Sequence, residues 1–537
     1  MKSFPIHLLW LTFLNVPLAC RGENILVYGA IATPSIRISM MPYMEALADK
    51  GHNVTYVTNI KAVDNFSKHP GIHEYLPKKW TALLSSSWEE EETFYSVRKN
   101  KGMIKSWYEL PNLGVTACEN LYSDSEFVEW VKSSNFDLVI VESLVNECGY
   151  GLAHLFGAKL IVYCSTTILP PFNDALGFPV ESPYISDFIF NFPPGNQMSF
   201  LERFVNAINP VVYTLIRRHF YLPSLEEITK KGLGLTELPS FADIEKNASL
   251  VMLTTHFSLD YPRSMPPNAI LVGGAVVSKM KKPLAKDLKE FIDQSDNGFV
   301  YISFGSLAEF TSLEESVQQE FLGAVVKFSN VRFVWKSSNP IKADLPSHIF
   351  VTKWVPQQTL LAHPKIKAFI THAGMGSITE AIHFSVPMIC TPIMAEQDLN
   401  ARMVASRGAG IVLEIVGLKS EELEHAISEV LNNEKYRNGM TKMTELFNDR
   451  QVSPLENAVW WTEYILRHDD SNSWLRSPSV DQSWWIIRQI DVWITAFLIV
   501  MSVLIIFTYI LYMCLRNIAS LLRNNRRMAN TIRKKTE

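Results

Sequence analysis

Cysteine is scarce in this chain, with 6 among 537 residues. Cys20 and Cys514 fall in apolar segments at the two ends. The other four are Cys118, Cys148, Cys164 and Cys390. Their spacing matches neither a disulfide framework nor a metal site, so no metal is predicted and the disulfide status of the four stays open. The last three have apolar neighbours, which predicts core thiols at those positions.

A surplus of positive charge is also missing, because 50 Lys and Arg face 54 Asp and Glu for a net charge of −4. This balance argues against a general nucleic-acid binder. An apolar share of 47% is typical of a globular chain, and the length gives room for two to four domains. Residues 516–537 nevertheless hold seven Lys or Arg and one acid, which bears on membrane orientation.

Both ends carry targeting signals. Lys2 followed by the apolar stretch 4–14 predicts a secretory signal over 1–22. The uncharged run 492–515 is long enough to cross a hydrocarbon core of ~30 Å at ~1.5 Å per residue. Interfacial tryptophans flank this run, namely Trp484, Trp485 and Trp493. We therefore expect a single-pass type I anchor in contact with membrane lipid, with the basic tail 516–537 cytoplasmic and everything before the anchor luminal.

Short motifs bear on the cellular compartment in which we expect the protein. Lys534 and Lys535 lie fourth and third from the end and resemble the dilysine address that returns proteins to the endoplasmic reticulum, the alternative being a merely basic tail. Glycosylation sequons occur at Asn53, Asn65 and Asn247. Asn53 borders a predicted strand, so Asn65 and Asn247 are expected to be better exposed and Asn53 is the least suitable acceptor.

Strands alternate with helices along the luminal part, which predicts parallel, doubly wound α/β sheets. The first series has strands over 24–28, 53–57, 138–141 and 159–163, with a helix over 39–50. The second has strands over 299–303, 331–335, 368–371 and 387–390. We expect domains over 23–277 and 278–470, a juxtamembrane segment over 471–491, and a helix over 453–466. Open sheets of this kind bind ligands at the carboxyl ends of their strands, so the cleft should lie between two facing domains.

The strongest pattern lies between Trp354 and Gln397. The apolar run 368–371 fits a buried strand, residues 372–377 break it, and helical spacing resumes from 378. Such a turn presents free backbone N–H groups and the positive end of a helix dipole, which suits a diphosphate.

This segment resembles the signature of the UDP-glycosyltransferase family, which includes the UDP-glucuronosyltransferases. The resemblance assigns Trp354 to stacking on uracil, Gln357 to the uridine, His372 and Ser377 to the diphosphate, Gly374 to close approach, Glu380 to the ribose, and Glu396 with Gln397 to the sugar hydroxyls. Ser306 matches the family's first phosphate-side loop of this domain.

The resemblance implies two Rossmann-like domains of the GT-B type, with the helix over 453–466 crossing back onto the first domain. It also implies inverting transfer of a hexose to small lipophilic acceptors. It implies a UDP-sugar as co-substrate, with neither metal nor other cofactor. Related transferases are further expected partners in homo- or hetero-oligomers. Glucose and glucuronate stay open as the sugar, because Glu396 and Gln397 would serve either.

One family feature is missing. The family activates its acceptor with a His in the first strand-to-helix loop, oriented by a later carboxylate. The matching loop is 32–37, and Ile36 stands where that His belongs. Glu142, at the end of the strand over 138–141, fills the carboxylate position and is the tentative catalytic residue.

Three interpretations follow. In the first, the acceptors are amines, which attack without prior deprotonation. In the second, Glu142 acts as a weaker base with a raised pKa for acidic phenols or carboxylic acids. In the third, the protein binds donor and regulates other transferases, since loss of a general base removes ~10² to 10⁴ of rate. The intact donor pattern favours the two enzyme interpretations. His256, near the end of the first domain, is expected to be structural.

Overall fold

The computed structural model describes residues 22–61, 69–87, 94–173, 175–179, 181–190, 192–193, 195–277, 282–305 and 309–536. The predicted signal up to residue 21, Asn65 and Ser306 lie outside these ranges. The chain forms two compact units, Met1–Ser477 and Pro478–Glu537.

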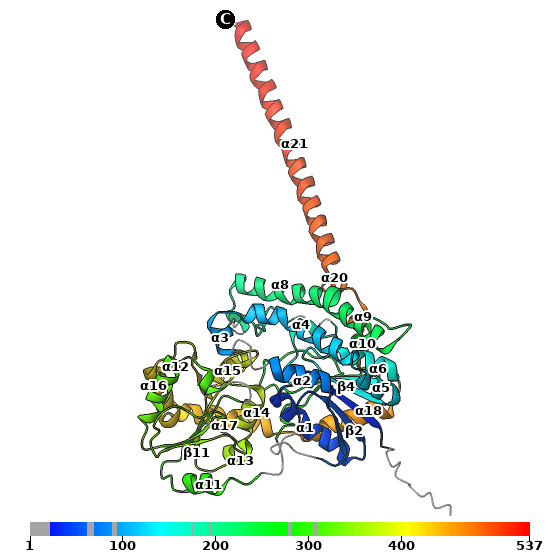
Figure 1. Cartoon of the computed structure of the whole chain (residues 1–537). Coiled ribbons are helices and arrows are strands. Elements are labelled where there is room, and N and C mark those ends of the chain that lie inside the picture. Colours follow the sequence, from blue (N-terminus) through cyan, green and yellow to red (C-terminus); the bar gives the residue numbers. More distant parts are fainter. Residues whose placement is uncertain are drawn as a thin grey trace, which may run out of the picture. The chain divides into compact units, whose positions relative to one another are not determined.

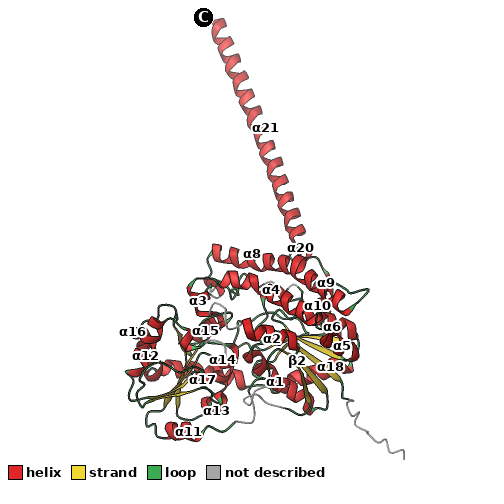
Figure 2. Cartoon of the chain, viewed as in Figure 1, coloured by secondary structure: helices red, strands yellow, loops and turns green. Residues whose placement is uncertain are grey.

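The first unit contains two parallel sheets, each with helices around it (Figures 1 and 2). One sheet has seven strands in the order β3-β2-β1-β4-β5-β6-β7, and the other has six in the order β10-β9-β8-β11-β12-β13. Each places its first strand beside its fourth, the arrangement of a Rossmann-like sheet. The predicted fold class is confirmed.

The strands of the first sheet are β1 (Asn24–Gly29), β2 (Asn53–Thr58), β3 (Ile72–Tyr75), β4 (Leu138–Glu142), β5 (Lys159–Cys164), β6 (Leu250–Leu253) and β7 (Ala269–Leu271). The longer helices of this half are α1 (Pro34–Asp49), α2 (Lys78–Ser87), α3 (Phe94–Lys99), α4 (Met103–Tyr122), α5 (Ser125–Ser133), α6 (Tyr150–Phe156), α8 (Phe200–Ile216), α9 (Leu222–Leu233) and α10 (Phe241–Lys246).

The strands of the second sheet are β8 (Phe299–Ser303), β9 (Arg332–Lys336), β10 (Ile349–Thr352), β11 (Ile366–Thr371), β12 (Met388–Cys390) and β13 (Gly410–Val412). Its helices are α11 (Lys286–Asp293), α12 (Glu315–Val326), α13 (Gln357–Leu361), α14 (Met375–His383), α15 (Gln397–Ser406), α16 (Ser420–Asn432) and α17 (Glu434–Asn448), followed by α18 (Pro454–Arg467) and α19 (Ser471–Leu475).

Apolar strand residues are buried on both faces of each sheet. In β1, Leu26 belongs to the apolar cluster on one face, while Ile25 and Val27 belong to the cluster on the other. Parallel sheets need this double burial because helices cover both faces, which explains the continuous apolar runs in the sequence.

The predicted helix over 39–50 begins earlier than expected, at Pro34. Thr33 caps it by accepting a hydrogen bond from the Ile36 amide at 3.3 Å, and proline suits the first helical position because its missing N–H has no partner there. Ile36 therefore lies in the first turn of α1 and not in a loop.

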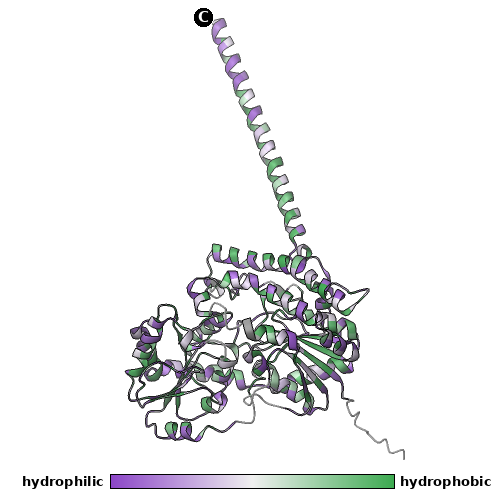
Figure 3. Ribbon diagram, viewed as in Figure 1, coloured by the Kyte–Doolittle hydropathy of each residue, from purple (hydrophilic) through white to green (hydrophobic). Residues whose placement is uncertain are grey.

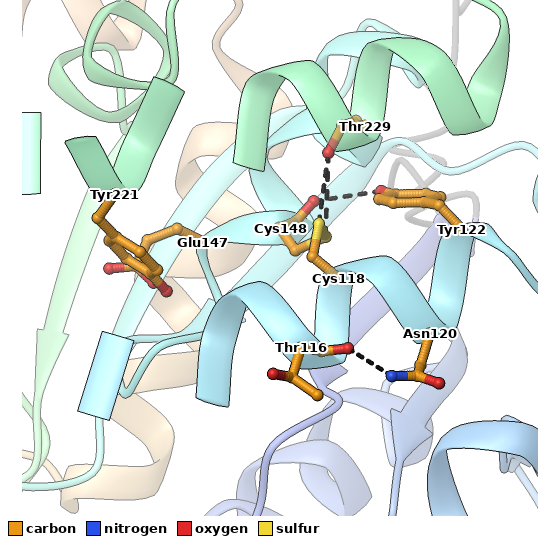
Figure 4. Close-up of a disulfide and its surroundings, with 8 residues drawn as sticks. All are labelled: Thr116, Cys118, Asn120, Tyr122, Glu147, Cys148, Tyr221 and Thr229. Atoms are coloured by element: carbon orange, nitrogen blue, oxygen red, sulfur yellow. Dashed lines mark hydrogen bonds between the residues drawn. A yellow bond between two sulfur atoms is a disulfide. The ribbon is translucent and has the colours of Figure 1, made fainter. Parts of the chain in front are cut away.

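The prediction of a core thiol at Cys148 is wrong, because Cys148 forms a disulfide with Cys118 (Figure 4). Cys118 lies in α4 and Cys148 in the turn before α6, with Cα atoms 5.8 Å apart, a normal separation for a bridge. Only the packing of α4 against this turn brings the two together. Cys164 and Cys390 are buried and free, as predicted, and burial raises the pKa of each thiol to about 12.

Helix α18 contacts α1 and the start of β5 in the first half of the chain. Ser453 and Glu456 form a capping box at its start. The Tyr43 hydroxyl on α1 shares a 2.5 Å hydrogen bond with Thr462, and the Lys159 ammonium donates to the Ile465 carbonyl. The segment that follows the second sheet in sequence, α18, thus packs on elements of the first half of the chain.

The second unit contains α20 (Trp484–Ile487) and α21 (Ile490–Thr536). Among the described residues, α21 is the one helix whose length and composition would let it cross a membrane. Its first part is apolar and its later part hydrophilic (Figure 3). The helix therefore continues past the predicted span, 492–515, through the basic tail.

Candidate active site

The candidate donor site lies at the carboxyl edge of the second sheet, where β8 and β11 are neighbours. Strands β9 and β10 extend from β8 in one direction, and β12 and β13 extend from β11 in the other. The loops after β8 and β11 therefore diverge at this point, which is where open α/β sheets bind ligands.

The ring of His372 is enclosed by two glycines. A Cβ atom on Gly305 would lie 2.6 Å from Nε2 of His372, and a Cβ on Gly374 would also lie 2.6 Å from it. Gly305 has φ +88°, which side chains rarely adopt, and its carbonyl accepts a hydrogen bond from the Lys336 ammonium at 2.6 Å. The imidazole consequently has one narrow slot between the loop after β8 and the start of α14.

His372 is a neutral imidazole at physiological pH. Burial lowers its pKa to about 4, and the Lys336 cation acts in the same direction. Its buried Nδ1 makes no hydrogen bond within the described part of the chain. Such an atom costs ~1–3 kcal/mol unless it finds a partner. The ring also makes a hydrogen bond to the Ser303 backbone, which opposes the lowering of its pKa.

Glu380 is the centre of a polar cluster that joins α13 and α14. The amide of Gln357 donates to one Glu380 oxygen at 2.6 Å, and that of Gln358 donates to the other at 2.7 Å. Gln357 also donates to Ser377 Oγ at 3.2 Å and accepts from the Tyr301 hydroxyl at 3.1 Å. Burial raises the pKa of Glu380, and the two amides oppose that shift. The structure thus brings Gln357, Ser377 and Glu380 together.

Trp354 follows β10 and is 40% exposed. The Lys282 ammonium lies 5.8 Å from its ring centre. A large planar ring left open to solvent can stack on a planar base.

Glu396 and Gln397 start α15 after the end of β12. The Gln397 side-chain oxygen accepts hydrogen bonds from the amides of Ile393 and Met394 at 2.8 and 3.0 Å. This fixes the carbonyl and leaves the amide nitrogen to donate to a ligand. Burial raises the pKa of Glu396. Ala395 immediately before it has φ 52°, a strained value for a residue other than glycine.

Arg98 is a residue that the sequence did not indicate. It lies on α3 in the first half of the chain, yet its two Nη atoms donate to Asp398 at 2.8 and 3.0 Å, and Nε and one Nη donate to Glu414 at 2.7 Å. Asp398 directly follows Gln397, so this clamp joins the first half of the chain to the turn that starts α15. Nothing in the local sequence distinguishes Arg98 from a solvated arginine, because its partners lie about 300 residues away.

Glu142 is fully buried at the end of β4. It accepts hydrogen bonds from the Leu144 amide at 2.8 Å, the Asn146 amide group at 3.1 Å and the Ser165 hydroxyl at 2.6 Å. Asn146 in turn accepts from the Ile31 amide at 2.8 Å, which ties this loop to the one after β1. Burial raises the pKa of Glu142 to about 7, against these hydrogen bonds.

Ile36 is 8% exposed and belongs to the apolar cluster that lines α1. His256, the other imidazole considered, shares a 2.9 Å hydrogen bond with Ser258 and packs against Phe257 and Phe447. These contacts fit its predicted structural role. Burial lowers the pKa of His256 to about 4.

The two sequon asparagines that the structure describes are both exposed, so the expected difference in exposure between them is not seen. Asn53 donates to the Asn24 side chain at 3.0 Å, and Asn247 accepts from Arg476 at 2.8 Å. Among the described ranges there is no cluster of three or more His, Cys, Asp or Glu that could hold a metal ion.

Comparisons with known proteins agree on one family. The family model described as "UDP-glucoronosyl and UDP-glucosyl transferase" matches residues 25–528. "UDP-glucosyltransferase 2" of Dactylopius coccus is 29% identical over 452 residues, covering 84% of this chain and 85% of the relative. "UDP-glucuronosyltransferase 1A9" of Homo sapiens is 29% identical over 421 residues, covering 78% and 76%.

Solved structures show the same fold at low identity. The calicheamicin glycosyltransferase CalG4 has a TM-score of 0.58 at 16% identity, covering 83% of this chain and 99% of its own. The glycosyltransferase VinC has a TM-score of 0.56 at 16% identity, covering 83% and 100%.

Proposed function

Because the chain belongs to the UDP-glucuronosyl and UDP-glucosyl transferase family, we propose that it transfers a hexose from a UDP-sugar to small lipophilic acceptors with inversion. The family membership makes it a glycosyltransferase that uses a UDP-sugar donor. The identity of the hexose, the acceptor class and the residue roles below belong to the proposal.

The observation that carries the proposal is the slot around His372. A neutral imidazole with an unpaired buried nitrogen lies at the start of α14, where the helix dipole favours an anion. A diphosphate there would receive hydrogen bonds from this ring and from the first amides of the helix. Those donors would stabilise the charge that develops as UDP leaves, which requires no metal.

The other donor roles follow from the neighbouring clusters. Exposed Trp354 would stack on the uracil, and the Gln357–Ser377–Glu380 cluster would meet the ribose and phosphate. The Gln397 amide nitrogen and Glu396 would hold the sugar hydroxyls beside the cleft. Either glucose or glucuronate could be held in this way.

Acceptor activation falls to Glu142 because Ile36 offers no proton-accepting group. Glu142 itself has no exposed surface, whereas Ser165, which donates to it at 2.6 Å, is partly exposed. An acidic hydroxyl acceptor would pass its proton to Ser165 Oγ while the serine proton moves to Glu142. The acceptor oxygen then attacks the anomeric carbon and UDP departs. A carboxyl with pKa of about 7 suits this role near neutral pH.

Amine acceptors need less help. Their free lone pair attacks directly, and the proton leaves only after the new bond has formed. The buried, apolar position of Ile36 fits such acceptors, because it adds hydrophobic surface where the family places its base.

A second candidate function is a donor-binding regulatory subunit of related transferases. It is favoured by the hydrogen bonds that surround Glu142, which leave the carboxylate oriented but enclosed.

Conjugation assays separate these functions. Membranes containing the protein are incubated with labelled UDP-glucose or UDP-glucuronate and with amines, phenols and steroids. Product with any acceptor supports the enzyme proposal, whereas donor binding without any conjugate favours the regulatory function. The Glu380→Ala variant should weaken UDP binding whatever the acceptor, and unchanged affinity would remove the donor-site assignment.

The Ile36→His variant tests the acceptor side. It places an imidazole in the first turn of α1 and should raise turnover of hydroxyl acceptors with little effect on amines. No gain in a folded variant would mean that this position does not face the acceptor.

We further propose that α21 anchors the protein in the endoplasmic reticulum membrane with both sheets luminal. The apolar first part of the helix, the basic residues after it, and Lys534 with Lys535 support this location and orientation.

A further inference from the structure

Helix α8 carries its apolar residues on the outside. Large apolar side chains are exposed along its whole length, and Phe220 extends the same character one turn beyond (Figure 3). These residues are Phe200, Leu201, Phe204, Val205, Ile208, Val212, Leu215, Ile216 and Phe220. Phe200, Leu201 and Phe220 are each 70–71% exposed. A helix on the surface of a soluble domain normally shows the opposite pattern.

The inner face of α8 is correspondingly polar and firmly attached. Buried Asn206 donates to the carbonyls of Ser182 and Ile185 at 2.8 and 2.7 Å. The Tyr108 hydroxyl on α4 donates to Asn209 at 2.7 Å, and the Tyr213 ring stacks on Trp107 at 5.1 Å. These contacts fix the rotation of the helix, so the apolar face cannot turn inward.

The middle of this face carries no charged residue. Residues 204–216 contain no Asp, Glu, Lys or Arg. The exposed cations Arg203 and Arg218 lie at either end of this stretch. A continuous uncharged face with basic residues at its ends suits a helix that lies in the interface of a bilayer, where the cations reach the phosphates.

We propose that this face of α8 inserts into the luminal leaflet as a second, monotopic membrane contact. The inference rests on the proposed anchor. Twelve residues, 478–489, separate the first unit from α21, and at ~3.3 Å per residue they span at most about 40 Å. A bilayer is therefore held within reach of the first unit at all times, which raises its effective concentration far above that of any soluble partner.

The test separates this contact from the anchor in the full chain. A protease site is inserted after Gln482, which is exposed, and the protein is reconstituted into protein-free phosphatidylcholine vesicles containing phosphatidylserine. After cleavage, most of the first unit should float with the vesicles. In the Phe204→Glu, Ile208→Glu, Leu215→Glu variant, the floating fraction should fall at least tenfold.

A matched control replaces three apolar residues of similar exposure elsewhere, Val326, Leu446 and Val452, by Glu. This control should stay with the vesicles, and thermal unfolding should confirm that both variants fold. Release of the wild-type unit from lipid, or equal release of the two triple variants, would overturn the proposal. Retention on native membranes but not on pure lipid would assign the face to a protein partner and overturn it too.

The uncleaved chain reports separately on the anchor. If it fails to float with the vesicles, then the anchor assignment is wrong and the inference about α8 is wrong with it. If it floats and only the cleaved unit is released, then the anchor stands and the α8 contact alone is refuted.

Discussion

Replacing Gly374 by Ala should weaken donor binding by displacing His372. The added Cβ would lie 2.6 Å from Nε2 of the imidazole, whereas ordinary van der Waals contact begins at 3.4 Å. Gly305 closes the opposite side of the slot, so the ring cannot move away without leaving it. A shift of roughly 1 Å is enough to break one hydrogen bond to a charged ligand, which is worth about 1.5–3 kcal/mol. At about 1.4 kcal/mol per tenfold, UDP should bind about 10- to 150-fold more weakly.

The assay is calorimetry of UDP binding to the purified full chain. Gly323→Ala, in the middle of α12, is the matched control, because its added Cβ would meet only the Ser420 hydroxyl at 3.3 Å. This control should leave UDP affinity unchanged. A double-mutant cycle then tests the cause. In a His372→Ala background, Gly374→Ala should cost nothing further. Full affinity in Gly374→Ala, or the same loss with and without His372, would refute the reasoning.

Three further predictions concern the rest of the first unit. Glu142→Gln should abolish the rise in turnover of hydroxyl acceptors that we expect as pH increases through about 7. Burial raises the folded-state pKa of Glu142, so its contribution to stability is complete below about pH 4.5 and is lost as pH rises to about 7. Denaturant titrations should show this loss as up to ~3 kcal/mol in the wild type and should not show it in the variant. Arg98→Gln should raise the donor KM several-fold more than it changes kcat in initial-rate measurements, and equal effects on both would contradict a clamp on the donor side. Cys118→Ser with Cys148→Ser frees a loop closed across 30 residues and should lower the free energy of unfolding by about 3–4 kcal/mol, measured by urea denaturation against the oxidised wild type.

The strand-to-helix turn that carries the candidate donor residues was the most predictable feature, because these residues are local in sequence. His372, Gly374, Ser377 and Glu380 lie within one strand-to-helix turn, so periodicity alone placed them at the edge of a sheet. The parallel architecture was predictable for the same reason, since strands buried on both faces appear as uninterrupted apolar runs.

Long-range contacts were not predictable. The Cys118–Cys148 bridge depends on how α4 packs, and each cysteine alone looks like a buried thiol. The role of Arg98 was not predictable for the same reason, because its ion-pair partners Asp398 and Glu414 lie in the other half of the chain. The start of α1 was missed although its signals were present: Thr33 as a cap and Pro34 at the first position.

Backbone with positive φ follows one strand of the first sheet and two strands of the second, in each case beside a proposed site residue. Val145 after β4, Ala373 after β11 and Ala395 after β12 all have φ between 52° and 66°. For a β-branched residue such as Val145 this conformation is especially costly, so the surrounding contacts must hold it in place. Those contacts include Asn146, which bonds both Glu142 and Ile31. Each of these three residues lies within three positions of a proposed site residue, namely Glu142, His372 or Glu396. Ser385 and Gln489 adopt the same conformation away from every proposed site residue, so positive φ alone does not identify a catalytic position, and the tie from Asn146 to Glu142 and Ile31 carries the argument for the acceptor side.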